Sequence, residues 1–354
     1  MLREVGKRKM SYIVKSTERT KKSGSEGETK ALLHLMSFRE DSEEIHFFVI
    51  DFFNDVTGMD KYSRKMWDVQ SKADKNSSPR SIGQDLVTLF KNYISEFDFS
   101  YYILFLGGVS NTFRKNNEEN IFGINNVKDS AKKTMIEGLK NEALKKTYID
   151  STKVTDTNIE KFVNQVIFVV DDKKSSEYVK EIVKNHIAII PNEETLIAIF
   201  NEIRNKQSEK KNINVENLIV EAPGDSLEYC KYITSSEIKM VILQRILNRN
   251  PLEKGVPISF TSIFNKWPEE IRREKLEECQ QSLCRALFNK NVSENFWELF
   301  EEVYSVIKQN PNKNIQDLYK KMDLDKCEKV PDFDILSLKY FISVMKDGIE
   351  NENN

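Results

Sequence analysis

Apolar positions in the first 110 residues change their period several times, so the chain begins as a mixture of helices and strands. After a Gly/Ser-rich stretch, helical spacing predicts a helix that ends near residue 38. Apolar runs of strand length predict strands over 44–58, 65–73 and 101–109. A Ser-Pro start followed by helical spacing predicts an amphipathic helix over 78–97. This order of elements indicates a mixed α/β fold.

The rest of the chain is mainly helical in pattern. A polar helical region is followed by one more apolar strand over 165–172 and by helical spacing to about residue 207. A polar stretch then marks a boundary, beyond which four segments carry helical periodicity. We therefore expect three parts: a basic N-terminal arm at 1–22, an α/β domain at 23–210, and an α-helical domain at 211–354 suited to partner docking or oligomerisation.

Composition narrows the class of protein. With 39% hydrophobic and 31% charged residues, and no apolar run of membrane-spanning length, the chain is expected to be a cytoplasmic protein without a membrane partner. The four cysteines form no CxxC pair and the three histidines are scattered. A zinc site, a disulfide framework and a histidine-based triad are therefore poorly supported, and carboxylates and lysine are the expected chemical groups.

Charge is distributed unevenly although the formal net charge is only −2. Residues 1–22 carry eight Lys/Arg against two acids, and residues 61–80 carry six against two. Such runs are most often solvated surface, but they also suit contact with a DNA backbone. The basic side chains proposed for DNA contact in the second run are Lys61, Arg64, Lys65, Lys75 and Arg80.

One predicted strand carries a row of polar side chains. Alternate residues of a strand share a face, so Asp68, Gln70 and Lys72 point one way while Trp67 and its alternates point the other. If this strand pairs with the preceding one, Asp55 can approach Gln70 and Lys72. A carboxylate, a second oxygen ligand and a lysine suit phosphodiester hydrolysis assisted by Mg²⁺ or Mn²⁺.

A neutral glutamine leaves the cation short of negative charge, so Glu28 on the first helix is a candidate further ligand. Each residue also has an ordinary explanation. Glu28 fits a capping box with Ser25, Asp55 suits a turn, and the polar row suits a solvated strand face. Other acids compete for the same role, namely Asp51, Asp60 and Asp68.

The ordered set of helix acid, Asp55, Gln70-Ser71-Lys72 and a following helix resembles the PD-(D/E)xK nuclease superfamily in its Q-x-K variant. The stretches "FFNDVTGMD", "WDVQSKADKNSSPRSIGQDLVTLFKNYI" and "YYILFLGG" look like the double-stranded-DNA nuclease domain of bacterial anti-phage effectors. The resemblance covers roughly residues 20–200. It implies a restriction-endonuclease-like mixed sheet flanked by helices, with Glu28, Asp55 and Gln70 as metal ligands and Lys72 as catalytic lysine.

This family includes effectors of cyclic-oligonucleotide (CBASS) immunity and the nuclease subunit of Lamassu systems, which works with an SMC-type ATPase. The helical C-terminal part is short for a cyclic-nucleotide sensor and favours the Lamassu-like subunit. We therefore expect a metal-dependent double-stranded-DNA endonuclease, held inactive until a sensor partner releases it and oligomeric when active. The alternatives are a non-catalytic DNA-binding or scaffold subunit, and a CBASS effector triggered by a cyclic oligonucleotide.

Overall fold

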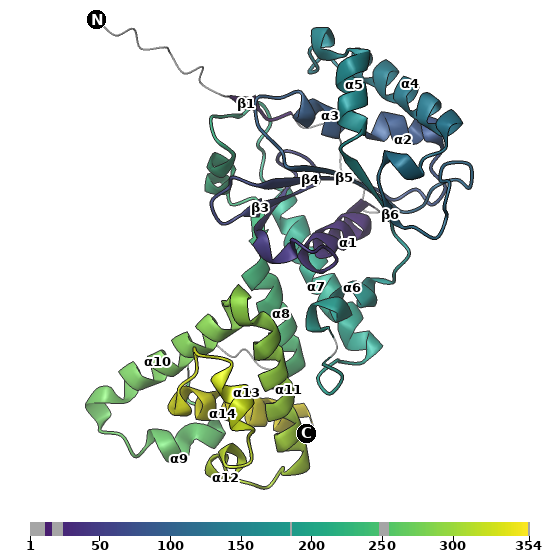
Figure 1. Ribbon diagram of the computed structural model, residues 1–354. Helices are drawn as coiled ribbons and strands as arrows, with labels where there is room; N and C mark the ends of the chain where they lie inside the picture. The colour runs from purple at the N-terminus through teal and green to yellow at the C-terminus, as the bar shows by residue number, and fades with distance from the viewer. Residues whose placement is uncertain (1–10, 16–23, 185, 248–254, 353–354) are drawn as a thin grey trace, which may run out of the picture. The chain divides into compact units, whose positions relative to one another are not determined.

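A computed structural model describes residues 11–15, 24–184, 186–247 and 255–352. The chain divides into two compact units. The first, which is α/β, comprises Met1–Tyr178 and Phe200–Ser235, and the second, which is helical, comprises Val179–Ile199 and Ser236–Asn354. Three helices, α6 (Ser175–Val183), α7 (Glu193–Lys211) and α8 (Ser235–Leu247), each contribute residues to both units (Figure 1).

The described part of the α/β unit is built on a mixed seven-stranded sheet in the order β6-β7-β5-β4-β3-β2-β9. The strands β2, β3 and β4 form an antiparallel meander, and β4, β5 and β7 run parallel to one another. Their bounds are β2 Ile45–Ile50, β3 Val56–Asp60, β4 Met66–Lys72, β5 Tyr101–Leu106, β6 Ile121–Phe122, β7 Val166–Val170 and β9 Tyr232–Thr234. The expected α/β class with a mixed sheet is thus confirmed.

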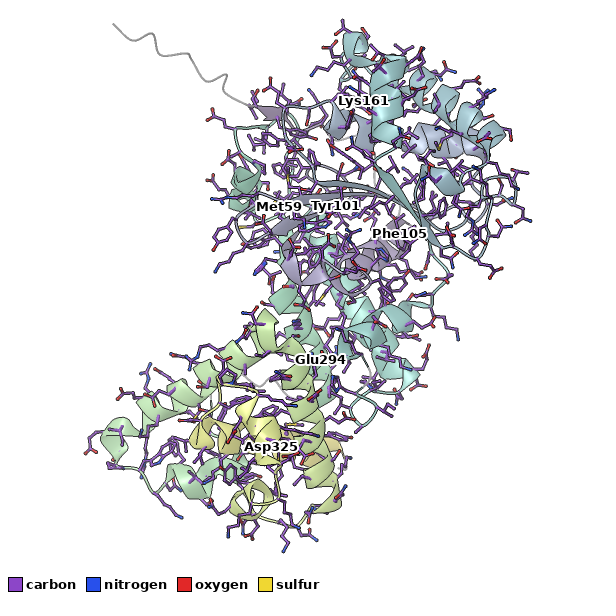
Figure 2. All side chains as sticks on the ribbon, viewed as in Figure 1. Met59, Tyr101, Phe105, Lys161, Glu294 and Asp325 are labelled. Carbon is purple, nitrogen blue, oxygen red and sulfur yellow. The ribbon has the colours of Figure 1, made fainter. Side chains whose placement is uncertain are left out.

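Helices cover both faces of this sheet (Figure 1). One face carries α1 (Gly24–Ser37), and the other carries α2 (Pro79–Asp85), α3 (Val87–Tyr93), α4 (Asp129–Lys145) and α5 (Asp156–Val163). Side chains of β5 alternate between the two sides: the ring of Phe105, labelled in Figure 2, lies 5.9 Å from His34 of α1, and that of Tyr102 lies 5.6 Å from Phe162 of α5. Both faces of the sheet are therefore buried, as expected for parallel strands.

The single strand expected over 44–58 is wrong, because the structure forms a hairpin there. Strands β2 and β3 pair with each other, and the turn between them is closed by a 3.2 Å hydrogen bond from the Asp51 amide to the Asp55 carbonyl. Asp51 adopts a positive φ of 52°, which aspartate tolerates better than most residues. The turn was hidden in the sequence because Phe52 and Phe53 within it are apolar and buried.

The strands expected at 65–73, 101–109 and 165–172 are confirmed as β4, β5 and β7. The helix expected over 78–97 is present as α2 and α3, which meet at Leu86. Ser78 caps α2 by accepting a 3.2 Å hydrogen bond from the Ser81 amide, so the Ser-Pro start marks the helix as expected.

The expected division at residue 210 differs from the units observed, since residues 211–235 carry two short strands. Of these, β9 extends the main sheet next to β2, and β8 (Ile219–Val220) pairs with β1 (Tyr12–Ile13). Most of the expected basic arm at 1–22 lies outside the described residues; Ser11 to Lys15 are described and include β1.

The second unit is helical, as expected for the C-terminal part. Its core includes an aromatic cluster in which the ring of Phe341 lies 5.8 Å from the rings of both Phe296 and Phe300. Its helices are α8 Ser235–Leu247, α9 Thr261–Phe264, α10 Glu269–Phe288, α11 Ser293–Gln309, α12 Ile315–Tyr319, α13 Leu324–Glu328 and α14 Ile335–Glu352. Within the described ranges, the structure has no helix whose length and apolarity would let it cross a membrane.

Candidate active site

Asp55 and Gln70 are in direct contact. Antiparallel pairing of β3 and β4 sets Val56 opposite Val69, which brings the preceding Asp55 against Gln70. The Gln70 Nε2 donates a 2.7 Å hydrogen bond to Asp55 Oδ2, and the Ser71 amide donates a second one to the same oxygen at 2.8 Å. Asp55 therefore lies immediately before β3, and it approaches Gln70 as the sequence suggested.

Helix α3 fixes the Gln70 amide from its other side. Thr88 Oγ1 donates a 2.6 Å hydrogen bond to Gln70 Oε1, and one turn later Asn92 Nδ2 donates a 2.7 Å bond to Asp68 Oδ2. Residues four apart on a helix rise about 6 Å, and residues two apart on a strand advance about 6.6 Å. The two spacings match, so α3 holds the polar row of β4 at two successive points.

Glu28 enters the same neighbourhood from α1. Its carboxylate is buried and accepts a hydrogen bond from Lys211 at the end of α7, and both side chains are 9% exposed. The adjacent Thr29 donates a 2.7 Å hydrogen bond to Gln207, which ties α1 to the last turns of α7. Glu28 thus has a long-range ion pair, a role that a capping box does not account for.

The pKa of the Asp55 carboxyl is shifted by burial and by neighbouring charges. Burial raises the pKa of Asp55 well above its ordinary value, and the charge of Glu28 raises it further. The Ser71 amide and the charge of Lys72 act in the opposite direction and lower that pKa. Glu28, Asp55 and Lys72 therefore lie within electrostatic range of one another, and a bound cation would relieve the repulsion between the two acids.

Lys72 is half-buried at the end of β4, on the face that it shares with Gln70. It lines a polar pocket of about 220 Å³ together with residues of α2, α3 and α4 and the position after α4, namely Gln84, Asp85, Val87, Thr88, Glu142 and Lys146. The lysine thus lies beside a space that a polar ligand can enter, close to the Asp55–Gln70 contact.

Glu28, Asp55 and Gln70 carry oxygen atoms of the type that magnesium prefers as ligands, and Lys211 already neutralises Glu28. Among the described residues there is no group of three or more His, Cys, Asp and Glu side chains placed to hold a metal, so the set here is two carboxylates and one amide. The NH₂ of Gln70 faces Asp55, and metal ligation requires the carbonyl oxygen there instead. A half-turn of the amide achieves this, because the Thr88 hydroxyl can accept a hydrogen bond as well as donate one.

The competing acids have other partners. Asp60 closes the β3–β4 turn by accepting hydrogen bonds from the amides of Arg64 at 2.6 Å and Lys65 at 2.9 Å. Asp68 is fully buried against Asn92. Asp51 remains near the site, since its charge raises the pKa of Asp55. Asp55 is therefore the acid in direct contact with the Gln70-x-Lys72 strand.

The basic run at 61–80 does not form one patch. Lys61, Arg64 and Lys65 lie at the turn before β4, whereas Lys75 and Arg80 follow its other end, and six strand steps span about 20 Å. The Lys65 ammonium is already 2.8 Å from Glu44 and lies 4.9 Å from the ring centre of Trp67. Lys75 and Arg80 are exposed and follow the end of β4 at which Lys72 lies.

Two residues of this neighbourhood were missed by the sequence reasoning, namely Thr88 and Lys211. Thr88 sits on the buried side of α3, where its polarity among apolar neighbours is a weak signal of a buried hydrogen bond. Lys211 is 183 positions from Glu28, and no local pattern singles it out.

Two glycines bring the chain ends of β4 and β5 together near Lys72. A Cβ on Gly107 would lie 2.6 Å from the Ala73 carbonyl oxygen, and one on Gly108 would lie 2.0 Å from the Lys75 carbonyl oxygen. The pair is therefore required by close backbone packing at the end of β5.

No protein-family model matches the chain, and comparisons with curated proteins and with solved structures gave no significant match.

Proposed function

We propose that this protein is a divalent-metal-dependent DNA endonuclease whose site comprises Glu28, Asp55, Gln70 and Lys72. The observation that carries the proposal is the 2.7 Å contact between Asp55 and Gln70, with Glu28 and Lys72 both acting electrostatically on Asp55. Glu28 and Asp55, which are far from β4 in the sequence, thus act together with Gln70 and Lys72 of that strand, and the four are the types needed for metal-assisted phosphodiester hydrolysis.

The order of elements around the site supports a restriction-endonuclease-like core. Helix α1 precedes the antiparallel meander β2-β3-β4, and α2 and α3 then lead to β5, which is parallel to β4. Asp55 lies immediately before the middle strand of the meander, and the Gln-x-Lys triplet lies on the next strand. This placement agrees with the resemblance of the sequence to PD-(D/E)xK nucleases.

In the proposed reaction three of the side chains would bind the metal ion and the fourth would act on the water or the phosphate. Glu28, Asp55 and Gln70 would supply oxygen ligands, and Mg²⁺ or Mn²⁺, when bound, would polarise the phosphate and lower the pKa of a water molecule. Lys72 would hold the attacking water or stabilise the negative charge that develops on the phosphate. Lys75 and Arg80 would contact the backbone of double-stranded DNA without reading sequence.

The biological setting follows from the same resemblance. The proposed role is the effector subunit of a Lamassu-like anti-phage complex, in which an SMC-like ATPase acts as sensor and the helical unit docks a partner or a second copy. Restraint until activation is part of this proposal, because an unregulated DNase would damage the cell's own DNA.

Cleavage of supercoiled plasmid in Mg²⁺ or Mn²⁺ tests the proposal, with the isolated protein and with its sensor complex. Lys72→Met is expected to abolish nicking and to keep the fold, whereas Lys133→Met, an exposed lysine of α4, keeps full activity. Full activity of Lys72→Met would remove the assigned role. Binding of DNA without cleavage in every condition would identify a scaffold subunit instead.

A further inference from the structure

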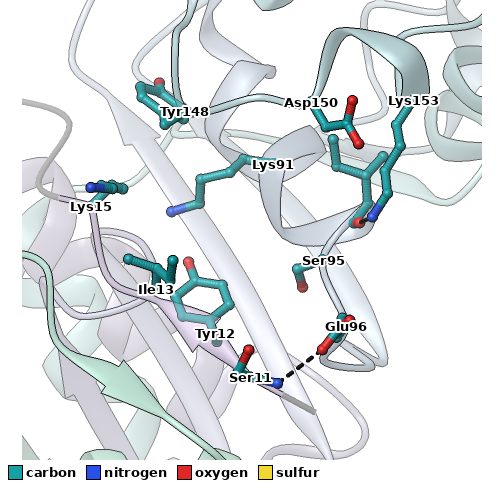
Figure 3. A pocket seen from close by; sticks show the side chains of 11 residues that line it. Ser11, Tyr12, Ile13, Lys15, Lys91, Ser95, Glu96, Tyr148, Asp150 and Lys153 are labelled. Carbon is teal, nitrogen blue, oxygen red and sulfur yellow. Dashed lines mark hydrogen bonds between the residues drawn. The ribbon is translucent and has the colours of Figure 1, made fainter. Parts of the chain in front are cut away.

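A second pocket lies in the α/β unit, and it includes none of the four proposed site residues. It has a volume of about 410 Å³ and opens between β1, the end of α3, and the segment from Tyr148 to Lys153 (Figure 3). This volume falls in the range of small-molecule sites, about 300–1,000 Å³. Its walls combine apolar side chains, among them Ile13 and Ile94, with three lysines.

Lys91 is the unusual member of this lining. Its side chain is 8% exposed and extends toward Tyr12, whose ring centre lies 5.2 Å from the ammonium nitrogen (Figure 3). Its one hydrogen bond within the described structure is to the Phe53 carbonyl oxygen at 3.3 Å, and no described carboxylate lies within 4.0 Å of Nζ. An ammonium group has three donors, so a buried one with a single long bond has capacity for an acceptor.

The other charged groups of the pocket are occupied by local contacts. Glu96 accepts a 2.9 Å hydrogen bond from the Ser11 amide, and Asp150 accepts bonds from the amide and hydroxyl of Thr152. Lys153 donates a 2.7 Å bond to the Ile94 carbonyl oxygen. The two acids thus stabilise the pocket walls, and Lys15 donates a hydrogen bond to Asn217. Lys91 differs from the other two lysines because it is buried and its single hydrogen bond is long.

The charge of Asp68 acts on Lys91, but no described carboxylate lies within 4.0 Å of its ammonium nitrogen. Burial lowers the pKa of Lys91 to about 8, and the nearby charge of Asp68 acts against this. An anion in the pocket would give Lys91 the close partner that the chain itself does not provide.

We propose that this pocket binds a small organic anion, whose carboxylate or phosphate accepts hydrogen bonds from Lys91 and whose flat apolar part packs against Tyr12, Ile13 and Tyr148. The position of the amine, the aromatic walls and the excess of lysines together favour this class of ligand over a neutral one. The pocket is separate from the proposed nuclease site, and the inference stands or fails independently of it.

Ligand-observed NMR titrations with four probes test the proposal: inorganic phosphate, phenyl phosphate, benzoate, and the neutral benzyl alcohol. At least one aromatic anion is expected to bind the full-length protein at least about tenfold more tightly than benzyl alcohol. Comparison of the affinities for phenyl phosphate and benzoate identifies the preferred charged group. Comparison of phenyl phosphate with inorganic phosphate shows how much the aromatic ring adds to the affinity. Equal binding of the neutral and anionic probes, or no binding of any of them, would overturn the proposal.

Variants locate the binding. Ile13→Glu places a negative charge in the pocket at a side chain that is already 50% exposed. It is expected to lower the affinity for the anionic probe at least about tenfold. Ile121→Glu, at a side chain 53% exposed outside the pocket, is the matched control and should bind as the wild type does. The double variant Asp68→Asn/Lys91→Met keeps the net charge and should also lose binding. Unchanged affinity in both test variants would contradict the assigned site.

Discussion

The ion pair between Glu28 and Lys211 allows a quantitative test of how charge is balanced at the site. Lys211→Met keeps most of the aliphatic stem and removes the ammonium that neutralises Glu28. Both side chains are 9% exposed, and removal of one partner from a buried pair costs about 3–5 kcal/mol. A loss of about 3 kcal/mol corresponds to a fall in melting temperature of about 6–12 °C for a unit of this size.

Added magnesium should reverse this loss, because a cation held by Glu28 and Asp55 replaces the missing positive charge. A ligand at one hundred times its dissociation constant stabilises the folded state by about 2.7 kcal/mol. The wild type should gain less, since Lys211 already neutralises Glu28. We therefore expect Lys211→Met to bind Mg²⁺ at least about tenfold more tightly, a difference of about 1.4 kcal/mol.

Thermal unfolding followed by circular dichroism, in EDTA and in a series of MgCl₂ concentrations, measures both effects. Lys210→Met, the preceding residue on α7, makes the same change of charge and serves as control. The reasoning is refuted if Lys211→Met is as stable as the control in EDTA, or if Mg²⁺ stabilises both variants equally.

Three further predictions concern stability and DNA contact. The pKa of Asp68 is about 7 in the folded protein against an ordinary 3.8, so the unfolded chain loses the Asp68 proton at a lower pH than the folded protein does. The free energy of unfolding should therefore fall as pH rises from about 4 to 7. The size of this fall is about 4 kcal/mol, and urea unfolding of Asp68→Asn should lack it; parallel pH profiles for the two proteins would contradict the assignment. Gly83→Ala would place a Cβ 2.0 Å from the Met135 carbonyl oxygen where α2 crosses α4, and should cost about 3 kcal/mol in urea unfolding. Gly123→Ala, which has no atom within 4 Å of its added Cβ, should be almost neutral, and equal effects would argue against this close packing. Lys75→Ala/Arg80→Ala should weaken DNA binding and reduce its salt dependence by about two phosphate contacts, while Lys61→Ala/Arg64→Ala should not; fluorescence anisotropy at several salt concentrations distinguishes the two ends of β4.

Strand alternation was the most informative sequence feature. It set Gln70 and Lys72 on one face of β4 and Trp67 on the other, and the structure places Gln70 against Thr88 of α3 and Ser71 near Gly27 of α1. This succeeded because a strand with both faces covered has a fixed two-residue period.

The hairpin at the preceding strand could not be predicted by the same means. Phe52 and Phe53 continue the apolar run through the turn, since the turn itself is buried in the core. Periodicity alone does not separate one long apolar strand from two short ones joined by a buried turn. Asp55 nevertheless lies against Gln70. The pairing of β3 with β4 fixes this contact whether residues 44–58 are taken as one strand or as a hairpin.

Long-range partners were also beyond local patterns. Lys211 meets Glu28 only after α7 packs on α1, and β9 joins the sheet from residue 232. The sequence offered Asp68 only as a competing acid, and in the structure it accepts a hydrogen bond from Asn92 and its charge acts on Lys91. Such contacts depend on tertiary packing, and residue types and spacing do not encode them locally.

The central claim is that Asp55, with Glu28 and Gln70, forms a divalent-cation site, and binding of Mn²⁺ followed by electron paramagnetic resonance tests it most directly. The wild type is expected to bind one ion, and Asp55→Asn is expected to bind it at least about tenfold more weakly while folding normally, since asparagine can still accept the Ser71 amide hydrogen bond. Asp60→Asn, in the turn before β4, is the control and should bind as the wild type does. Equal Mn²⁺ affinity in the wild type and Asp55→Asn would contradict the account.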